Sequence, residues 1–252
     1  RAAFLALGHA TQTGEPVAVV CTSGTALLNY APAVAEAYYQ KLPLIVISAD
    51  RPMEWIDQDD SQTIRQNEAL AQFVKKSYDL PARCDDDTAL WYANRIVNDA
   101  VSEATSSQRA PVHINVQIDE PINAVAEWTG KQRIIEVSEP SAELSAEAIS
   151  RLADEAMGKN ILIIAGFSQH DACLEAEINR LAEFPNVAVL TETIANIKGS
   201  RLIAAVDRTL LAMDSDKKFV PDLLITIGGA LVSRMVKAFM RQNKPAAHSN
   251  GG

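Results

Sequence analysis

The chain has 252 residues, of which 48% are hydrophobic and 22% are charged, and its formal net charge is −9 at pH 7. This composition is typical of a globular protein with one large domain or two smaller ones. The acidic balance and the lack of a basic stretch disfavour nucleic acid and anionic membranes as partners. The apolar runs are too short to span a bilayer, and no signal peptide is evident. The three cysteines (Cys21, Cys84 and Cys173) fit no disulfide framework or metal motif, which favours reduced thiols in the cytoplasm.

Short apolar runs alternate with helical stretches in the first half of the chain. Residues 1–14 predict a helix that has no capping residue before it and so begins upstream of Arg1. We therefore expect a piece of a longer protein, cut at both ends. Residues 51–66 are predicted as a polar loop that enters a helix. Strands that are apolar throughout and separated by helices predict a parallel sheet covered on both faces. The predicted strands are 17–23, 42–50 and 111–118, and the predicted helices are 25–40, 67–80 and 85–104.

The second half repeats this pattern after a break. Residues 122–140 lose the periodicity and predict a linker between a domain at 1–121 and another at 141–252. The chain closes in KPAAHSNGG, which predicts a frayed or engineered tail. The fold class is therefore α/β, with two Rossmann-like parallel-sheet units. In the second unit we expect helices at 141–158 (capped by Ser141), 172–184, 207–213 and 231–242, and strands at 160–168, 186–193 and 221–231.

The turn Ser23-Gly24-Thr25 connects the first predicted strand to a helix. Gly24 permits a positive φ, and Thr25 is a candidate helix cap. Backbone N–H groups left at such a helix start suit an anion or a polar ring. A turn with a purely architectural role remains the alternative.

Arg51 follows the second predicted strand, in the sequence Ser48-Ala49-Asp50-Arg51-Pro52. Ligands of open α/β sheets bind beyond the carboxyl ends of the strands. The planar guanidinium group of arginine suits a carboxylate ligand. The alternative is a salt bridge between Arg51 and Asp50 or Glu54.

Three further positions are weaker candidates. Gln62 and Gln66 are four residues apart and would share one face of a helix, although a solvated helix start is the alternative. Arg234 follows the Gly228-Gly229 turn in the first turn of the last helix, where a cation weakly suggests a nearby anion. His113 lies inside a predicted strand and is expected to be structural. No metal-ligand pattern is present in the sequence.

Two groups of motifs, taken together, resemble a known family. The sequence TSGT followed by NYAPAVAEA resembles thiamin-diphosphate-dependent enzymes in general. The sequence ADRPME and the later QTIRQ resemble in particular the menaquinone-pathway branch of that family. The resemblance is strong over residues 1–121, where it implies a pyrimidine-binding domain, and looser over 141–242, where it implies part of a central domain.

The resemblance implies thiamin diphosphate and Mg²⁺ as cofactors, but with essential parts outside this chain. In the family, a glutamate protonates the aminopyrimidine ring, and it would lie just before Arg1. The domain that binds diphosphate through Mg²⁺ would also lie outside the 252 residues. We therefore expect no catalytic residue within this chain and no turnover by the chain alone.

The resemblance also implies the substrates, 2-oxoglutarate and isochorismate. The family decarboxylates the first and adds the resulting carbanion to the second, in subunits that self-associate as homodimers or homotetramers. It implies that Arg51 and Gln62 contact substrate, that Ser23, Gly24 and Thr25 line the cofactor pocket, and that Arg234 replaces a common lysine. The alternatives are another thiamin-diphosphate enzyme, such as acetolactate synthase or a 2-oxoacid decarboxylase, and a non-catalytic assembly module.

Overall fold

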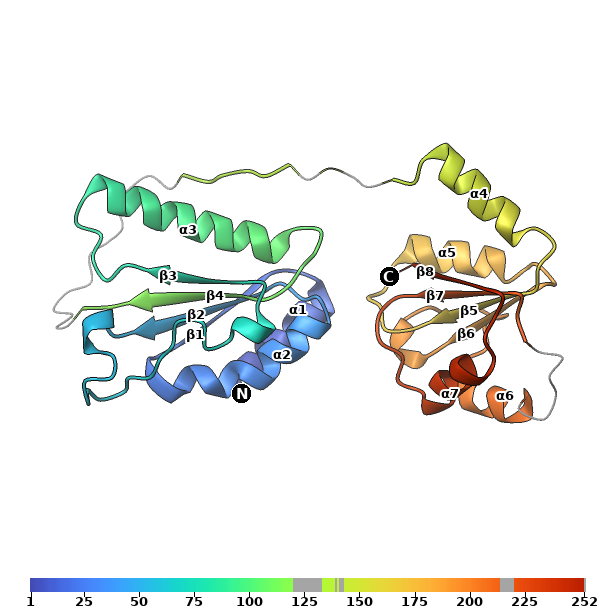
Figure 1. The fold of residues 1–252 in the computed structure, drawn as a ribbon, viewed down its shortest axis with the longest axis horizontal. Helices are drawn as coiled ribbons and strands as arrows, with labels where there is room; N and C mark the ends of the chain where they lie inside the picture. Colours follow the sequence, from blue (N-terminus) through green and yellow to red (C-terminus); the bar gives the residue numbers. More distant parts are fainter. Residues whose placement is uncertain (120–132, 139, 141–142, 214–219, 252) are drawn as a thin grey trace. The chain divides into compact units, whose positions relative to one another are not determined.

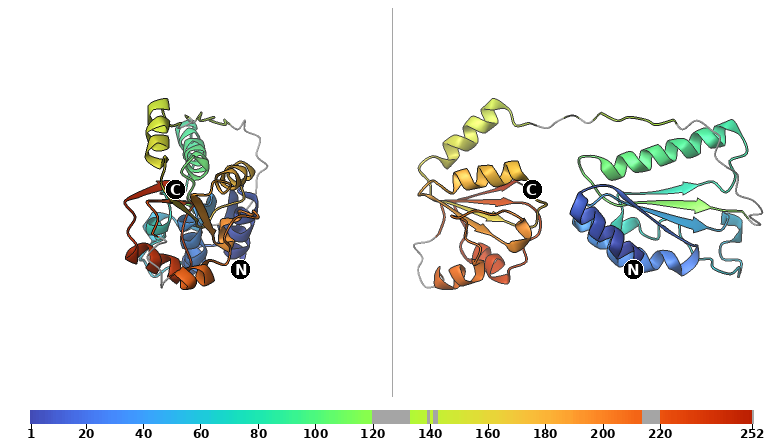
Figure 2. Two further views of the ribbon diagram at one scale, coloured as in Figure 1. Left: turned by 90° about the vertical axis from the view of Figure 1, so that its right-hand side faces the viewer. Right: turned by 180° about the vertical axis from the view of Figure 1, so that it is seen from behind.

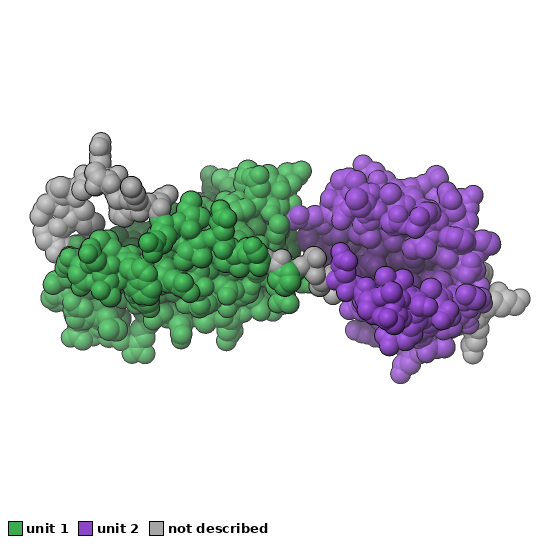
Figure 3. Space-filling model, turned by 90° about the horizontal axis from the view of Figure 1, so that it is seen from above, with its two compact units in different colours: residues 1–141 green, residues 142–252 purple. Residues whose placement is uncertain are grey.

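The computed structural model describes residues 1–119, 133–138, 140, 143–213 and 220–251. The chain divides into two compact units, Arg1–Ser141 and Ala142–Gly252, which are coloured separately in Figure 3. Most of the predicted linker at 122–140 lies outside the described residues. No helix in the described part of the chain has both the length and the apolar character needed to cross a membrane.

The first unit contains a parallel four-stranded sheet in the order β1-β2-β4-β3 (Figure 1). All four strands run in the same direction, so their carboxyl ends lie side by side at one end of the sheet. We call this end the carboxyl edge. The strands are β1 (Val17–Cys21), β2 (Leu44–Asp50), β3 (Lys76–Leu80) and β4 (Val112–Gln117).

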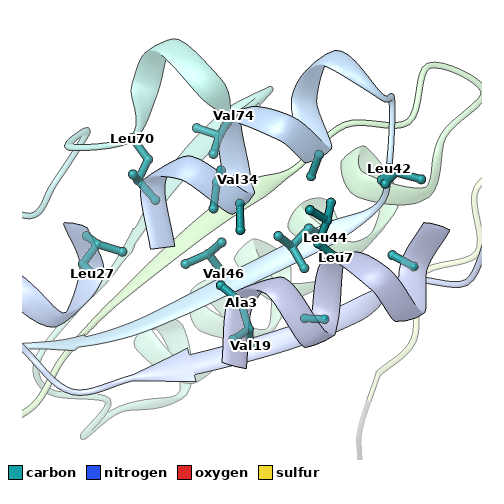
Figure 4. Close-up of a cluster of buried hydrophobic side chains, with 14 residues drawn as sticks. Ala3, Leu7, Val19, Leu27, Val34, Leu42, Leu44, Val46, Leu70 and Val74 are labelled. Carbon is teal, nitrogen blue, oxygen red and sulfur yellow. The ribbon is translucent and has the colours of Figure 1, made fainter. Parts of the chain in front are cut away.

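Helices cover both faces of this sheet (Figures 1 and 2). On one face, α1 (Ala2–Thr13) and α2 (Ala31–Tyr39) bury small and branched side chains against β1 and β2, and Figure 4 shows this cluster. On the other face, α3 (Asp87–Thr105) packs Ile96, Ala100 and Ala104 against β3 and β4. The sequence-based prediction of a doubly covered parallel sheet is therefore confirmed.

The predicted helix at 25–40 is in fact two elements. A 3-10 helix, η1 (Gly24–Tyr30), precedes α2, and Pro32 lies in the first turn of α2. Proline has no N–H to donate and its ring clashes with the preceding turn, so it begins a helix more readily than it continues one. Thr25 is not the cap, because Ser23 occupies the N-cap position and makes no side-chain capping bond.

The predictions for 51–66 and 67–80 are partly wrong. Residues 51–66 form a loop with one short 3-10 helix, η2 (Met53–Trp55), and Asp57, Asp59 and Gln62 have positive φ, which is incompatible with an α-helix. The 67–80 segment contains another 3-10 helix, η3 (Ala71–Phe73), and then β3. In β3, Tyr78 and Leu80 alternate with polar residues and pack into the core beneath α3. Tertiary packing thus overrides the helical propensity of this segment.

Part of the predicted linker binds to the first unit. Asn98 on α3 donates from Nδ2 to the carbonyl of Arg133, at 3.0 Å, and accepts the N–H of Ile135 at Oδ1, at 2.8 Å. One side-chain amide therefore satisfies both polar groups of an extended backbone.

The second unit has its own parallel sheet, in the order β6-β5-β7-β8 (Figure 1). Helix α5 (Ala172–Leu181) covers one face, and α6 (Val206–Met213) and α7 (Arg234–Gln242) cover the other. The short η4 (Thr193–Ala195) follows β6. The strands are β5 (Ile161–Ala165), β6 (Val187–Thr191), β7 (Leu223–Ile227) and β8 (Ala247–Gly251).

Three expectations for the second unit need correction. The expected tail is the edge strand β8, which pairs in parallel with β7 from Ala247 to Gly251. Helix α4 (Ala146–Ala156) is capped by Ser145, whereas the proposed cap Ser141 lies outside the described residues. Helix α7 begins at Arg234 rather than at 231, because the Ser233 side chain accepts the N–H groups of Met235 and Val236.

Candidate functional site

The turn after β1 lies at the carboxyl edge of the first sheet. Gly24 has φ +82°, a conformation that most side chains disfavour, and a Cβ there would lie 3.1 Å from the carbonyl oxygen of Gln62. Gly24 is buried, Ser23 is half-buried and Thr25 is exposed. The two hydroxyl side chains therefore flank a residue that is held tightly by its surroundings.

Gln62 and Gln66 approach this turn in different ways. Gln62 is exposed, has φ +55°, and touches Gly24 through its backbone. Gln66 is 1% exposed, and its Oε1 accepts the N–H of Gly24 at 2.5 Å. The expectation that this N–H is left for a ligand is therefore wrong. The structure brings Gln62 next to the Ser23–Thr25 turn, although by backbone contact and not on a helix face.

Asn115 on β4 is the centre of a buried polar network. Its Oδ1 accepts from Gln66 Nε2 and from Ser48 Oγ, each at 3.0 Å. Its Nδ2 donates to Asp50 Oδ2 and to Asp79 Oδ1, each at 2.8 Å. The four bonds satisfy the amide completely, and they connect three neighbouring strands on one face of the sheet.

Asp50 ends β2 and is 6% exposed, so it lies inside the unit. Burial raises the pKa of its carboxyl group; the hydrogen bonds from Asn115 and the Arg51 N–H oppose this rise, whereas the nearby Asp79 charge adds to it. The N–H groups that Asn115 and Arg51 donate stabilise the charged form of the Asp50 carboxyl group. Asp50 and Asp79 thus share the Asn115 amide, and each has a second partner, the Arg51 N–H for Asp50 and Gln117 Nε2 for Asp79.

Arg51 extends from the end of β2 between two hollows in the surface. Its Nε lies 3.6 Å from Asp60 Oδ2, and the side chain is 18% exposed. One hollow, of about 260 Å³, is lined by Arg51, Pro52, Trp55, Asp60, Ile118 and Asp119. The other, of about 170 Å³, also contains Gln66, Asn115, Asp50 and Asp79. Arg51 therefore places a cation at a polar, recessed edge next to the network, and Arg65 lines the smaller hollow with it.

His113 is fully buried beside this network. Its Nε2 lies 2.7 Å from Ser48 Oγ, and because that hydroxyl donates to Asn115, the Nε2–H must donate to Ser48. The ring is then neutral, and within the described residues its Nδ1 has no hydrogen-bond partner. Burial lowers the pKa of His113 to about 4. The expectation of a structural histidine fits this geometry.

This shift predicts a specific acid sensitivity. The unfolded chain takes up a proton near pH 6.5 and the folded chain only near pH 4, so stability is complete above about pH 6.5 and is lost as pH falls through this window. Between pH 7 and pH 5, the protonation of His113 should lower the free energy of unfolding by about 2 kcal/mol. In urea unfolding followed by tryptophan fluorescence, His113→Gln should lack this part of the loss while retaining a donor to Ser48. An equal loss in both proteins would contradict the assignment.

The second unit places Arg234 at the start of α7, where it is exposed. Two acidic side chains lie at this helix start: the Glu192 carboxylate accepts the N–H groups of Val232 and Ser233 at 2.8 and 2.7 Å, and Asp207 accepts from the Ser233 hydroxyl group. The Gly228-Gly229 turn is explained by packing, because a Cβ at Gly228 would lie 2.8 Å from the carbonyl oxygen of Phe167. A role of Arg234 in substrate binding stays a prediction.

Sequence reasoning did not identify Asn115, Asp79 or the role of Gln66 in the site. A signal was available, since His113, Asn115 and Gln117 alternate with apolar residues along β4 and must share one face of the sheet. Among the described residues, no group of three or more His, Cys, Asp or Glu side chains is arranged to hold a metal ion.

Comparison with known proteins defines the class. Residues 1–70 match the family described as thiamine pyrophosphate enzyme, N-terminal TPP binding domain. A solved structure from Mycobacterium smegmatis, of a protein assigned as a thiamin diphosphate-dependent enzyme, superposes with a TM-score of 0.64 at 19% identity. It covers 90% of this chain and 43% of that protein, and at this identity it shows the fold alone. Residues 1–70 are thus similar to the N-terminal TPP binding domain of thiamine pyrophosphate enzymes.

The particular relatives are more specific. The chain is 44% identical to the 2-succinyl-5-enolpyruvyl-6-hydroxy-3-cyclohexene-1-carboxylate synthase of Porphyromonas gingivalis and 42% identical to that of Desulfotalea psychrophila. Each match covers 98% of this chain but only 43% and 47% of the relatives. The chain is therefore a homologue of these synthases that spans a little less than half of their length.

Proposed function

We propose that this chain forms the pyrimidine-binding domain and part of the central domain of a synthase that uses thiamin diphosphate and Mg²⁺. The synthase decarboxylates 2-oxoglutarate and joins the remaining four-carbon unit to isochorismate, which makes it a transferase. We further propose a cytoplasmic, homo-oligomeric enzyme. The observation that carries the proposal is the identity of 44% to a synthase of this name over 98% of the chain.

The turn after β1 is suited to one side of the cofactor. Thiamin diphosphate, when bound, supplies an electron sink for the decarboxylated substrate. Ser23 and Thr25 present hydroxyl groups on either side of Gly24, and Gly24 is fixed by contacts with Gln62 and Gln66. A rigid turn with polar side chains fits a flat heteroaromatic ring that needs directional hydrogen bonds. We assign Ser23, Gly24 and Thr25 to this role.

Arg51 and Gln62 are the proposed substrate-binding residues of the first unit. Both substrates are dicarboxylates, and a chain with a net charge of −9 needs locally placed cations to hold them. Arg51 is partly buried in a recessed edge, where a guanidinium group binds a carboxylate more strongly than in open water. Gln62 is exposed beside the cofactor-binding turn and offers an amide to the same ligands. Arg234 is proposed as a third contact, from the second unit.

The proposal predicts that the 252-residue chain has no activity by itself. The chain spans less than half of its synthase relatives, and we propose that the diphosphate-binding domain and the proton-relay glutamate lie outside it. The purified chain should show no consumption of 2-oxoglutarate with isochorismate, thiamin diphosphate and Mg²⁺. The full-length enzyme, meaning this chain together with the further residues that its relatives have, should show turnover that depends on thiamin diphosphate.

Three outcomes would contradict the proposal. Turnover by the purified chain would mean that the catalytic groups lie within it. Absence of turnover in a folded full-length enzyme would favour the non-catalytic assembly module. Turnover with pyruvate alone would instead favour acetolactate synthase or a simple decarboxylase.

A further inference from the structure

Gln66 is a buried amide that connects three separate segments of the first unit. Its Oε1 accepts the N–H of Gly24, its Nε2 donates to the carbonyl of Ala49 at 2.9 Å, and the same Nε2 donates to Asn115 Oδ1. The side chain is 1% exposed. It therefore acts within the unit and contacts no solvent-borne ligand directly.

The contacts require an amide and not merely a polar side chain. A glutamate could still accept from Gly24 but could not donate to Ala49 and Asn115 when ionised. An apolar side chain would leave the Gly24 N–H, the Ala49 carbonyl and Asn115 Oδ1 without this buried partner. Glutamine satisfies all three at once.

The bonds of Gln66 continue to the arginine at the edge of the sheet. Asn115 donates to Asp50 Oδ2, and Asp50 Oδ1 accepts the backbone N–H of Arg51 at 2.9 Å. An unbroken series of hydrogen bonds thus runs from Gly24 through Gln66, Asn115 and Asp50 to Arg51. The two ends of this series are the turn assigned to the cofactor and the arginine assigned to the substrate.

We propose that Gln66 is a positioning residue that fixes the Ser23–Thr25 turn relative to Arg51, so that cofactor and substrate meet in one geometry. This rests on the proposed function for the roles of the turn and of Arg51. The contact between Gln66 and Gly24 does not rest on it. A shift of about 1 Å in the turn or in Arg51 would move the cofactor and the substrate out of the geometry in which they react.

The contact is tested on the 252-residue chain by amide hydrogen exchange. Gln66→Ala should accelerate exchange of the Gly24 N–H by about tenfold, whereas Gln66→Glu, which keeps an acceptor, should accelerate it less. Gln58→Ala, at an exposed glutamine of the same loop, is the matched control and should change nothing. Equal Gly24 exchange in Gln66→Ala and in the control would overturn the proposal.

The positioning role is tested in the full-length enzyme, well below the melting temperatures. Gln66→Ala should lower kcat/KM by about tenfold and raise the thiamin diphosphate concentration needed for half-maximal activity, whereas Gln58→Ala should do neither. The kcat/KM of Gln66→Glu, relative to that of the wild type, should rise as the pH falls from about 8 to 6, because a protonated carboxyl group can again donate a hydrogen bond. Variants that match the control at every pH would overturn the role. An inactive wild-type enzyme would refute the proposed function instead, and Gly24 exchange would still test the contact.

Discussion

Replacing Asn115 by leucine is expected to lower the free energy of unfolding of the first unit by about 3 kcal/mol or more. The leucine side chain has a similar volume but removes both donors from Asp50 and Asp79 and the acceptor from Gln66 and Ser48. Each of these four side chains keeps another partner but loses one buried hydrogen bond, which costs roughly 0.5–1.5 kcal/mol for a neutral group and about 1.5–3 kcal/mol for a carboxylate.

The measurement is urea unfolding at pH 7, followed by tryptophan fluorescence. Trp55 and Trp91 lie in the described part of the first unit, and the sequence from Ala142 to Gly252 contains no tryptophan, so the signal reports on the first unit. Asn67→Leu changes an exposed asparagine of the same unit and should shift the midpoint little. Similar midpoints for Asn115→Leu and Asn67→Leu would show that the network contributes little to stability.

Replacing Arg51 by alanine in the full-length enzyme is expected to reduce kcat/KM for isochorismate or 2-oxoglutarate by at least about tenfold. A guanidinium–carboxylate contact in a partly buried site is worth roughly 1.5–3 kcal/mol, and 1.4 kcal/mol corresponds to one decade. Arg51→Lys should restore only part of the loss, because an ammonium group lacks the planar pair of donors.

Stability separates this role from a structural one. The contact of Arg51 with Asp60 is long, at 3.6 Å, and Asp60 is 38% exposed, so the loss of this one ion pair should change the melting temperature little. Steady-state kinetics should therefore be measured beside a melting curve for both variants. If Arg51→Ala keeps wild-type kcat/KM and melts at a lower temperature, Arg51 is a structural partner of Asp60.

The sequence predicted the layered parallel sheets because β2 and β5 contain continuous apolar runs, which are typical of strands covered on both faces. It did not predict β3, where the helix-favouring residues before Lys76 outweighed the alternation of Tyr78 and Leu80. It also did not predict β8, because Ala247–Gly251 has polar residues and glycine and is a strand only by pairing with β7. Edge strands depend on a neighbour that local sequence does not reveal.

The candidate site divides in the same way. The positions of Gly24 and Arg51 could be predicted, since a glycine permits a tight turn and an arginine after a parallel strand lies at the carboxyl end of the sheet, whereas their binding roles stay predictions. The contacts of Gln66 could not, because its partners lie 42, 17 and 49 residues away in sequence. Loop 51–66 has several residues with positive φ, and only the folded unit shows how this loop brings Gln66 to Gly24.

The most direct test of the assignment is product analysis by mass spectrometry on the full-length enzyme with thiamin diphosphate and Mg²⁺. Isochorismate and 2-oxoglutarate together should give one product that contains isochorismate and the four-carbon unit, with release of one CO₂ for each product formed. Pyruvate in place of 2-oxoglutarate should give little product. Formation of acetolactate from pyruvate, with no coupled product from isochorismate, would contradict the account.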